Sequence, residues 1–338
     1  PNRRLKSIMR AVVCHAITDD LSGVGIHHLP IPTPGPGQAL VRVRAASVGF
    51  PDILLCQGKY QLKLQPPFTP GMNLAGEIAA LGEAAPNSGT APAIGAEVVG
   101  TARHGALAEY ALVEVENLRP MPAALTLTQA AAYPSAYLTA YVSLVRRAAL
   151  QPDEVLLVHG ASGGTGLATL DLTKTLGATV IATSGSDAKL AVLKAYGADH
   201  LINLNDGFAD RVKELTAGHG ADVIFDPVGG DVFDESTRCI AFDGRLLVIG
   251  FTSGRFATLR SNIALIKGFS VVGVRAGEYG RRFPERGREN RAAIWDLANA
   301  GRIRPRVHAE LSLQDTLAGF ALLQERAVIG KVVIRCDQ

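Results

Sequence analysis

The sequence has few cysteines and little excess charge. Its cysteines form no CxxC pair and no close cluster, which argues against a disulfide framework or a zinc knuckle. The formal net charge of +3 at pH 7 is too small to indicate nucleic acid or a membrane surface as a partner. No apolar run reaches the length of a membrane span. We therefore expect a globular protein of the reducing cytoplasm, with four unpaired cysteines: Cys14, Cys56, Cys239 and Cys336.

The N-terminal stretch PNRRLKSIMRAVVCHAI is basic, but it is not interpreted as a signal peptide. Its apolar run is short and is soon followed by Asp19 and Asp20. Met9, followed by RAVV, would make a natural start. Residues 1–8 are therefore a candidate extension of the chain.

The 338 residues exceed the usual size of one core, so two domains are expected. Residues up to about 125 are typical of short strands separated by turns, and helical apolar spacing begins at Thr128. Strands then alternate with helices, which predicts a parallel sheet with helices on both faces. After residue 276 an Arg-rich loop, a helix near 292–301 and two last strands are expected. We predict an α/β fold in which a doubly wound domain, 128–276, is inserted into a β-rich domain formed by 1–127 and 277–338.

The stretch VHGASGGTG, residues 158–166, lies between an apolar strand and a helix. Glycines at the start of a helix let a pyrophosphate approach backbone N–H groups, and the helix dipole attracts the anion. The run departs from the strict GxGxxG pattern, but its strand-turn-helix context is the one that the motif requires. Gly163, Gly164 and Gly166 therefore predict a dinucleotide site.

The end of the next strand indicates which dinucleotide is bound. Binders of NAD carry an acidic residue there, which takes the ribose hydroxyls. In TVIATSGSDAK, residues 179–189, the strand ends with Thr183, Ser184 and Gly185, and no carboxylate follows before Asp187. Lys189 lies one helical turn beyond Ser184 and can pair with a 2′-phosphate. The combination favours NADP(H).

The chain resembles the zinc-independent quinone oxidoreductase (zeta-crystallin-like) branch of the medium-chain dehydrogenase/reductase superfamily, over essentially its whole length from Met9. The resemblance is carried by the order and spacing of VGFPDILLCQGKYQ (48–61), PPFTPGMNLAGEIAALG (66–82), SAYLTAYVSL (135–144), the glycine-turn region 158–190 and VIGFTSG (248–254). It implies a GroES-like catalytic domain and a Rossmann domain that binds NADPH. It also implies cofactor contacts from Phe50, Thr139, Ser162, Gly163, Gly164, Thr165, Ser184, Gly185, Lys189, Val228, Gly250, Phe251, Val274 and Arg275.

Two positions depart from this family. Relatives often have Asn where this chain has Gly49, and Glu where it has Asn73. The first departure weakens any inherited role for an amide that polarises the substrate.

The sequence lacks the catalytic residues that two other classes of oxidoreductase require. Zinc alcohol dehydrogenases would place Cys near Ser47 and a His-Glu pair near Met72 and Asn73, and no close His spacing suggests another metal site. Short-chain dehydrogenases use Tyr-x-x-x-Lys, which is absent. No metal is therefore expected, and His104 and His159 are expected to be packed or solvated. Hydride transfer to an electron-poor acceptor needs less electrophilic help.

The predicted function is NADPH-dependent reduction of quinones or α,β-unsaturated carbonyls. Tyr60 is the candidate auxiliary hydrogen-bond donor, Asp52 is expected to orient a neighbour, and Lys59 is a further candidate. One alternative is an enoyl-CoA reductase, whose anionic substrate the basic segment 275–290 could hold. Another is a non-catalytic NADPH-binding protein with a structural or RNA-binding role. The open edge of the strand SVVGV, 270–274, predicts a homodimer.

Overall fold

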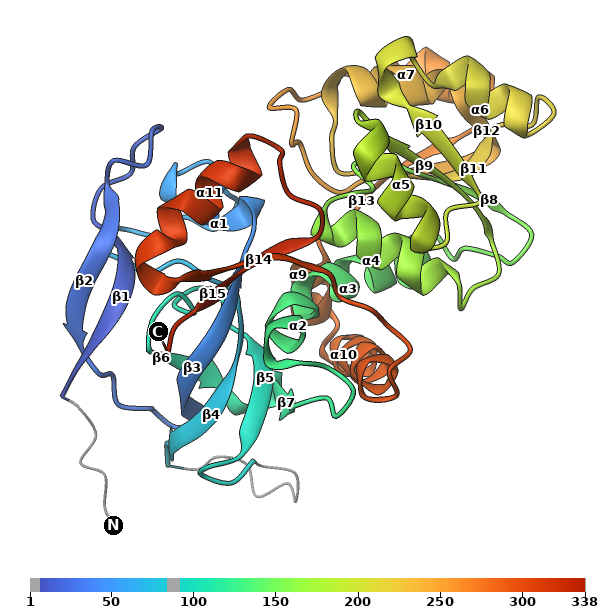
Figure 1. Cartoon of the computed structure of the whole chain (residues 1–338). Helices are drawn as coiled ribbons and strands as arrows, with labels where there is room; N and C mark the ends of the chain where they lie inside the picture. The colour runs from blue at the N-terminus through green and yellow to red at the C-terminus, as the bar shows by residue number, and fades with distance from the viewer. Residues whose placement is uncertain (1–6, 84–91, 338) are drawn as a thin grey trace. The chain divides into compact units, whose positions relative to one another are not determined.

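A computed structural model describes residues 7–83 and 92–337 (Figure 1). The chain forms two compact units. Unit 1 combines residues 1–135 with 297–338, and unit 2 consists of residues 136–296. The residues before and after the inserted unit thus belong to one body. Of the candidate extension, residues 1–6 lie outside the described part of the chain, and Ile8 begins the first strand.

Unit 1 is built on a seven-stranded sheet in which β6 pairs with β3, beside the path β14-β15-β3-β4-β5-β7. β15 runs antiparallel to β3 and brings the end of the chain back to the first part of the unit. The strands are β3 (Gln38–Val48), β4 (Asn73–Leu81), β5 (Glu97–Thr101), β6 (Tyr110–Glu114), β7 (Leu118–Pro120), β14 (Val307–Ser312) and β15 (Lys331–Arg335). A separate antiparallel pair consists of β1 (Ile8–Cys14) and β2 (Val24–Pro30).

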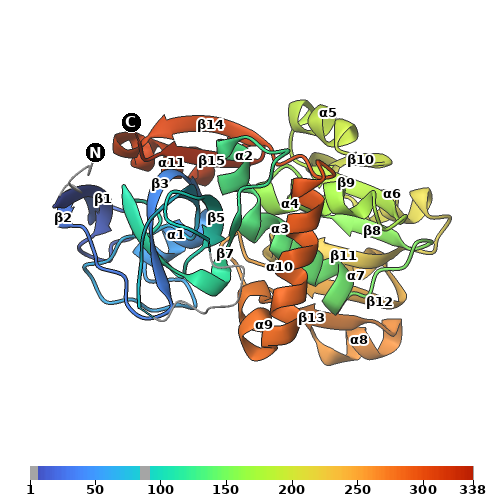
Figure 2. The same cartoon turned by 90° about the horizontal axis from the view of Figure 1, so that it is seen from below.

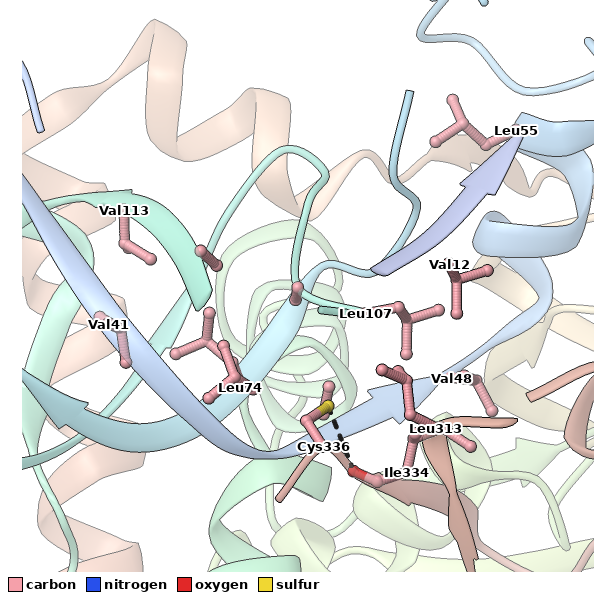
Figure 3. Close-up of a cluster of buried hydrophobic side chains, with 14 of the residues drawn as sticks. Val12, Val41, Val48, Leu55, Leu74, Leu107, Val113, Leu313, Ile334 and Cys336 are labelled. Carbon is pink, nitrogen blue, oxygen red and sulfur yellow. Dashed lines mark hydrogen bonds between the residues drawn. The ribbon is translucent and has the colours of Figure 1, made fainter. Parts of the chain in front are cut away.

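The core of unit 1 lies on one face of this sheet (Figure 3). Val48 of β3, Leu74 of β4 and Ile334 of β15 contribute to it, together with Leu107 from a connecting segment. The described part of the unit contains the α-helices α1 (Phe50–Cys56), α2 (Leu127–Ala132) and α11 (Thr316–Gln324). Residues from both ends of the chain thus share one core, because the predicted last strand joins the sheet beside β3.

Unit 2 contains a six-stranded parallel sheet in the order β10-β9-β8-β11-β12-β13. This order confirms the predicted doubly wound fold, and its switch point lies between β8 and β11. The strands are β8 (Val155–Val158), β9 (Thr179–Ser184), β10 (His200–Asn203), β11 (Ala221–Asp226), β12 (Ile240–Val248) and β13 (Ser270–Gly273). The helices are α3 (Pro134–Tyr141), which starts in unit 1, a π-helix (Val142–Arg147), α4 (Gly164–Thr173), α5 (Asp187–Ala195), α6 (Ala209–Leu215), α7 (Gly230–Cys239), α8 (Ser261–Lys267), α9 (Ala276–Arg282) and α10 (Pro284–Asn299).

The predicted Arg-rich loop at 275–290 is wrong, because this segment forms α9 and the start of α10 (Figure 2). Pro284 stands at the first position of α10, where a missing N–H costs nothing. Gly280 and Gly287 bring the two helices together, since a methyl group on Gly287 would lie 2.8 Å from the Gly280 Cα. The glycines and the proline that suggested a loop therefore serve helix packing and helix initiation.

The unit boundaries differ from the expected 127/128 and 276/277. α2 packs on β3 and β4, which keeps it in unit 1. α10 is tied to the π-helix of unit 2 by Arg146, whose Nε donates to Asn290 Oδ1 at 2.8 Å and whose Nη2 lies 2.7 Å from Glu289. Unit 2 therefore extends to residue 296. Within residues 7–83 and 92–337, no helix is long and apolar enough to cross a membrane.

Candidate functional site

Most of the residues predicted to bind the cofactor lie at one edge of the sheet in unit 2. They follow the carboxyl ends of five parallel strands, and such ends meet at the same edge. They are Ser162–Thr165 after β8, Ser184 and Gly185 at the end of β9, Val228 after β11, Gly250 and Phe251 after β12, and Val274 and Arg275 after β13. Three predicted residues lie outside these strand ends: Lys189 in α5, Thr139 in α3, and Phe50 at the start of α1 in unit 1.

The glycine turn leaves the N-terminus of α4 open to an anion. Gly160 has a positive φ of 55°, and the Gly163 N–H donates to the Gly160 carbonyl at 3.0 Å. No side chain caps the helix, so its first N–H groups are offered to a ligand. A methyl group on Gly163 would meet nothing closer than 3.4 Å, whereas one on Gly166 would lie 2.4 Å from the Gly160 oxygen. Gly166 is therefore required by packing, and Gly163 leaves room above the turn.

The end of β9 carries Ser184, which is buried, ahead of Gly185, around which there is open space. Asp187 begins α5, and its Oδ1 accepts a hydrogen bond from Asn203 Nδ2 at 2.7 Å. Lys189 follows in the first turn of the same helix. The first carboxylate after β9, that of Asp187, is thus held by the Asn203 amide. In the sequence it lies between the Ser184 hydroxyl and the Lys189 ammonium group.

His159, inside the glycine turn, is fully buried. One ring nitrogen lies 2.9 Å from Thr183 Oγ1 and the other 3.0 Å from Ser236 Oγ, while the ring packs against Phe208. Burial lowers its pKa to about 3, so the ring is neutral at physiological pH. This agrees with the expected packed role, since the ring joins β8, β9 and α7.

Sequence reasoning missed Asp226, the last residue of β11. Its Oδ1 accepts the backbone N–H groups of Val228 at 2.8 Å and Gly229 at 2.9 Å. Burial raises the pKa of this carboxyl group. The neighbouring loop is fixed as well, because Thr252 N donates to the Pro227 carbonyl at 3.1 Å. An acidic residue directly at a strand end was the signal that could have revealed it.

In unit 1, Asp52 is buried in the first turn of α1. Its Oδ2 accepts the Gly49 N–H at 2.8 Å and its Oδ1 accepts the Gly71 N–H at 3.0 Å. Burial is the main cause that raises the pKa of Asp52 to about 6, while Lys331 and the two N–H groups lower it. Both oxygens thus hold backbone segments in place, which supports the positioning role expected for this residue.

The other predicted catalytic candidates lie just after α1. Tyr60 is partly buried against the core of unit 1, and its backbone N–H donates to the Leu54 carbonyl at 3.1 Å. Lys59 points instead to the surface, where its Nζ lies 2.7 Å from Asp19 Oδ1. Of these two, Tyr60 remains the candidate for substrate contact.

Lys331, at the start of β15, was not among the candidates. Burial lowers the pKa of its ammonium group, and the charge of Asp52 partly offsets this effect. Only the register of β15 against β3 brings it near α1, so no local sequence pattern would have identified it.

The positions where a zinc dehydrogenase would hold its metal carry other groups. Ser47 supplies a hydroxyl, and Asn73 Oδ1 accepts hydrogen bonds from the hydroxyl and N–H groups of Ser135 at 2.5 and 3.1 Å. Across the described ranges, no three His, Cys, Asp or Glu side chains come together as metal ligands. The donor set at these positions therefore suits hydrogen bonding better than zinc.

Comparisons with known proteins divide the chain in the same way. The family pattern "Alcohol dehydrogenase GroES-like domain" matches residues 35–123, and "Zinc-binding dehydrogenase" matches residues 164–290. A quinone oxidoreductase-like protein 2 homolog of Nematostella vectensis is 37% identical over 308 residues, 90% of this chain and 83% of that protein. Mouse prostaglandin reductase-3 is 36% identical over 229 residues, which are 67% of this chain and 58% of that protein. The Escherichia coli quinone oxidoreductase complexed with NADPH has a TM-score of 0.88 at 25% identity, covering 96% of this chain and 99% of that one.

Proposed function

The chain belongs to the quinone oxidoreductase-like branch of the medium-chain dehydrogenase/reductase superfamily, and we propose that it uses NADPH to reduce quinones or α,β-unsaturated carbonyls. One observation carries this proposal. A helix N-terminus whose N-cap residue, Gly163, has no side chain to cap it, and where an added methyl group would still fit at 3.4 Å from the Gly160 oxygen, lies beside the switch point of a doubly wound sheet. That is where such folds bind the pyrophosphate of a dinucleotide.

The residues at the edge of the sheet fit NADPH. Ser162–Thr165 would hold the pyrophosphate, and Ser184 with Lys189 would hold the 2′-phosphate. No carboxylate that would repel this phosphate stands at the end of β9. The first one along the chain is Asp187, which accepts a hydrogen bond from Asn203. When bound, the cofactor supplies a hydride for transfer to the acceptor. The E. coli relative was itself crystallised with NADPH, which supports this choice.

The reaction is proposed to need no metal ion. One matching family is described as zinc-binding, but this chain has Ser47 and Met72-Asn73 where thiolate and imidazole ligands would be expected. Quinones and enones are already electron-poor, so hydrogen bonds to the acceptor oxygen replace a Lewis acid. Tyr60 is the proposed auxiliary donor, and Asp52 positions the backbone around Gly49.

A panel of acceptors tests the proposal directly. The purified protein is assayed with NADPH and NADH against a naphthoquinone, a simple enone and crotonyl-CoA, and its metal content is measured. We expect NADPH-dependent turnover of the quinone or the enone without stoichiometric zinc. Faster turnover of crotonyl-CoA would favour an enoyl-CoA reductase. Tight NADPH binding with no turnover would favour the non-catalytic alternative and contradict the proposal.

The basic segment gives the enoyl-CoA alternative little support. Glu278 accepts hydrogen bonds from Arg281 at 3.0 Å and Arg282 at 2.9 Å. Arg286 stacks on the Phe283 ring, with 5.2 Å between the guanidinium carbon and the ring centroid. These arginines are engaged within α9 and α10, so they are less available to bind the phosphates of coenzyme A.

We also propose that two copies associate along β13, the last strand of the sheet in unit 2. Apolar side chains near this edge are exposed to an unusual degree: Phe242 by 79%, Leu265 by 83% and Ile266 by 72%. An unpaired edge beside an apolar patch is commonly covered by a partner. Light scattering should give a dimer that Ile266→Asp converts to a monomer, while Leu317→Asp, on α11 of unit 1, changes nothing. A monomeric parent protein would contradict this.

A location in the cytoplasm remains part of the proposal. All four cysteines are free and buried, and none is paired with another. Free thiols are usual in a reducing compartment. Labelling of an expressed tagged chain in cell fractions would test this.

A further inference from the structure

The register of β15 against β3 places Lys331 opposite Gly49. Val332 pairs with Val48 in this antiparallel ladder, so the residue before Val332 faces the residue after Val48. A methyl group added to Gly49 would lie 3.0 Å from Lys331 Nζ and 3.9 Å from Asp52 Oδ2. The ammonium group therefore occupies the space that a side chain at position 49 would take.

Among residues 7–83 and 92–337, no group accepts a hydrogen bond from the Lys331 ammonium group. Asp52 is nearby, but its two oxygens accept the N–H groups of Gly49 and Gly71. In the part of the chain that the structure describes, no carboxylate lies within 4.0 Å of Lys331 Nζ and no hydrogen bond from it is found. Lys331 as a whole is half-buried, and burial acts on its ammonium group. An amine with unused donors can bind an oxygen of a ligand that reaches it.

A second unused donor lies on the same face of the sheet. Ser47 is fully buried, and its Oγ has no hydrogen-bond partner among the described residues. Alternate residues of a strand share a face, so Ser47 lies on the face of Gly49 and of the opposite residue Lys331. A buried polar atom without a partner is costly and is usually satisfied by a ligand or water. Two donors that find no acceptor among the described residues mark a place for an oxygen-rich ligand.

We propose that Lys331 Nζ is a catalytic group that donates the proton taken up by the oxygen of the acceptor, in the place left free by Gly49. This inference rests on the proposed reductase function. The hydride brings two electrons to the acceptor carbon, and the π pair moves to the oxygen. The N–H bond breaks with its electrons left on nitrogen, and a new O–H bond forms. The neutral amine then regains a proton from water, so the cofactor is oxidised and the acceptor is reduced.

The surroundings of Lys331 suit a group that gains and loses a proton. Asp52 on α1 is the group whose charge favours the ammonium form, while burial favours the neutral amine. Ser47 on β3 and Gly49, which follows β3, carry no charge, and α2 (LTQAAA) has no ionisable side chain. Arg306, which precedes β14, is exposed, and its backbone carbonyl accepts the Lys331 N–H at 3.0 Å. A lysine acid whose pKa lies below 10.5 releases its proton more readily than an ordinary one.

Two substitutions distinguish proton donation by Lys331 from the effect of its positive charge alone. Lys331→Met removes the donor and should lower kcat/KM for an enone about 100-fold at pH 7, with NADPH affinity unchanged. Lys331→Arg keeps a hydrogen bond and should restore part of the rate. In the parent enzyme the rate should fall as the pH rises through the pKa of Lys331. In Lys331→Arg this fall should disappear, because guanidinium does not titrate in that range.

The outcomes distinguish this inference from the reductase function. Lys194→Met, an exposed lysine of unit 2, serves as the control and should leave the rate and its pH profile unchanged. Gly49→Asn in the Lys331→Met background should recover only part of the activity, because an amide in the same space can donate a hydrogen bond to the acceptor oxygen but cannot give it a proton. Turnover by the parent enzyme with less than a twofold effect of Lys331→Met would overturn the role of Lys331 alone. No turnover by the parent enzyme with any acceptor would overturn both.

A readout independent of turnover is the reactivity of the amine itself. Acetic anhydride labels only the neutral form of an amine, so the pH dependence of labelling, followed by mass spectrometry, reports its pKa. We expect the midpoint for Lys331 to lie below 10.5, the ordinary pKa of a lysine, and a saturating enone to slow labelling of Lys331. A midpoint at or above 10.5 together with no protection by the enone would contradict the proposal.

Discussion

The two candidate regions differ in the chemical groups that they offer a ligand. The edge of the sheet in unit 2 offers mainly backbone, with an uncapped helix and glycines that leave space. The region around Gly49 in unit 1 offers side chains, with the carboxyl group of Asp52 fixed by backbone N–H groups and the amine of Lys331 brought in by a distant strand. A backbone site tolerates few changes of shape, whereas a side-chain site can be altered one group at a time.

Gly166→Ala tests the backbone site of unit 2 and is expected to have the largest effect on stability and NADPH binding. Its methyl group would lie 2.4 Å from the Gly160 oxygen and 2.6 Å from the Ala161 Cα, and backbone atoms cannot move aside easily. The free energy of unfolding should fall by about 3 kcal/mol, with loss of NADPH binding. Urea denaturation and fluorescence titration measure both quantities.

Gly163→Ala is the matched control for this change. Its methyl group would have 3.4 Å of clearance within the protein, so stability should change by less than about 0.5 kcal/mol. NADPH affinity should nevertheless fall at least about tenfold, because the methyl group fills the space offered to the pyrophosphate. Equal stability of the Gly166 and Gly163 variants would show that the turn is not constrained as described.

In unit 1, Asp52→Asn should change how stability depends on pH. The folded pKa of Asp52, about 6, lies above the ordinary value of 3.8 for an aspartate. The protonated Asp52 therefore contributes to the free energy of unfolding fully below about pH 4. This contribution decreases as the pH rises through 6, by up to about 3 kcal/mol. Asn does not titrate, so the difference in unfolding free energy between the two proteins should change across this window. Urea denaturation at several pH values tests this, and a constant difference would contradict it.

Lys189→Ala should reduce NADPH affinity by about 2 kcal/mol, because it removes a charge-assisted contact with the 2′-phosphate. The affinity for NADH should stay the same, so the preference between the two cofactors narrows. Lys194→Ala, in the same helix but exposed at its last turn, is the control. Fluorescence titration with both cofactors decides the question, and an unchanged preference in Lys189→Ala would remove the assignment.

The smallest effect is expected from Tyr60→Phe. One neutral hydrogen bond to a developing oxyanion should be worth about 1.4 kcal/mol, so an enone should react about tenfold more slowly. A quinone should be affected less, since its reduced oxygen is better stabilised without help. Steady-state rates with both acceptors measure this difference. Complete loss of both activities, with the fold and cofactor affinity intact, would make Tyr60 an obligatory acid.

The backbone site of unit 2 could be predicted from the sequence better than the side-chain site of unit 1. The parallel sheet and its glycine turn could be predicted because each leaves a local pattern of apolar runs, glycines and spacing. The predicted residues after β11, β12 and β13 were implied only by the family resemblance. The helix expected near 292–301 corresponds to the end of α10, but the helical structure of residues 276–290 was missed, because glycines that pack helices together look like glycines that break them. Lys331 was missed because its neighbourhood depends on a strand pairing that joins distant parts of the chain.

The pairing of β15 with β3 also has a consequence for how the protein is made. The ribosome must synthesise the whole of unit 2 before Lys331 emerges. Until then the β3 edge that β15 later covers is unpaired, and exposed strand edges are templates for aggregation. Unit 2 can already fold, because domains generally fold as units during synthesis. Chains that stall before residue 331 are therefore the species that most need protection by a chaperone.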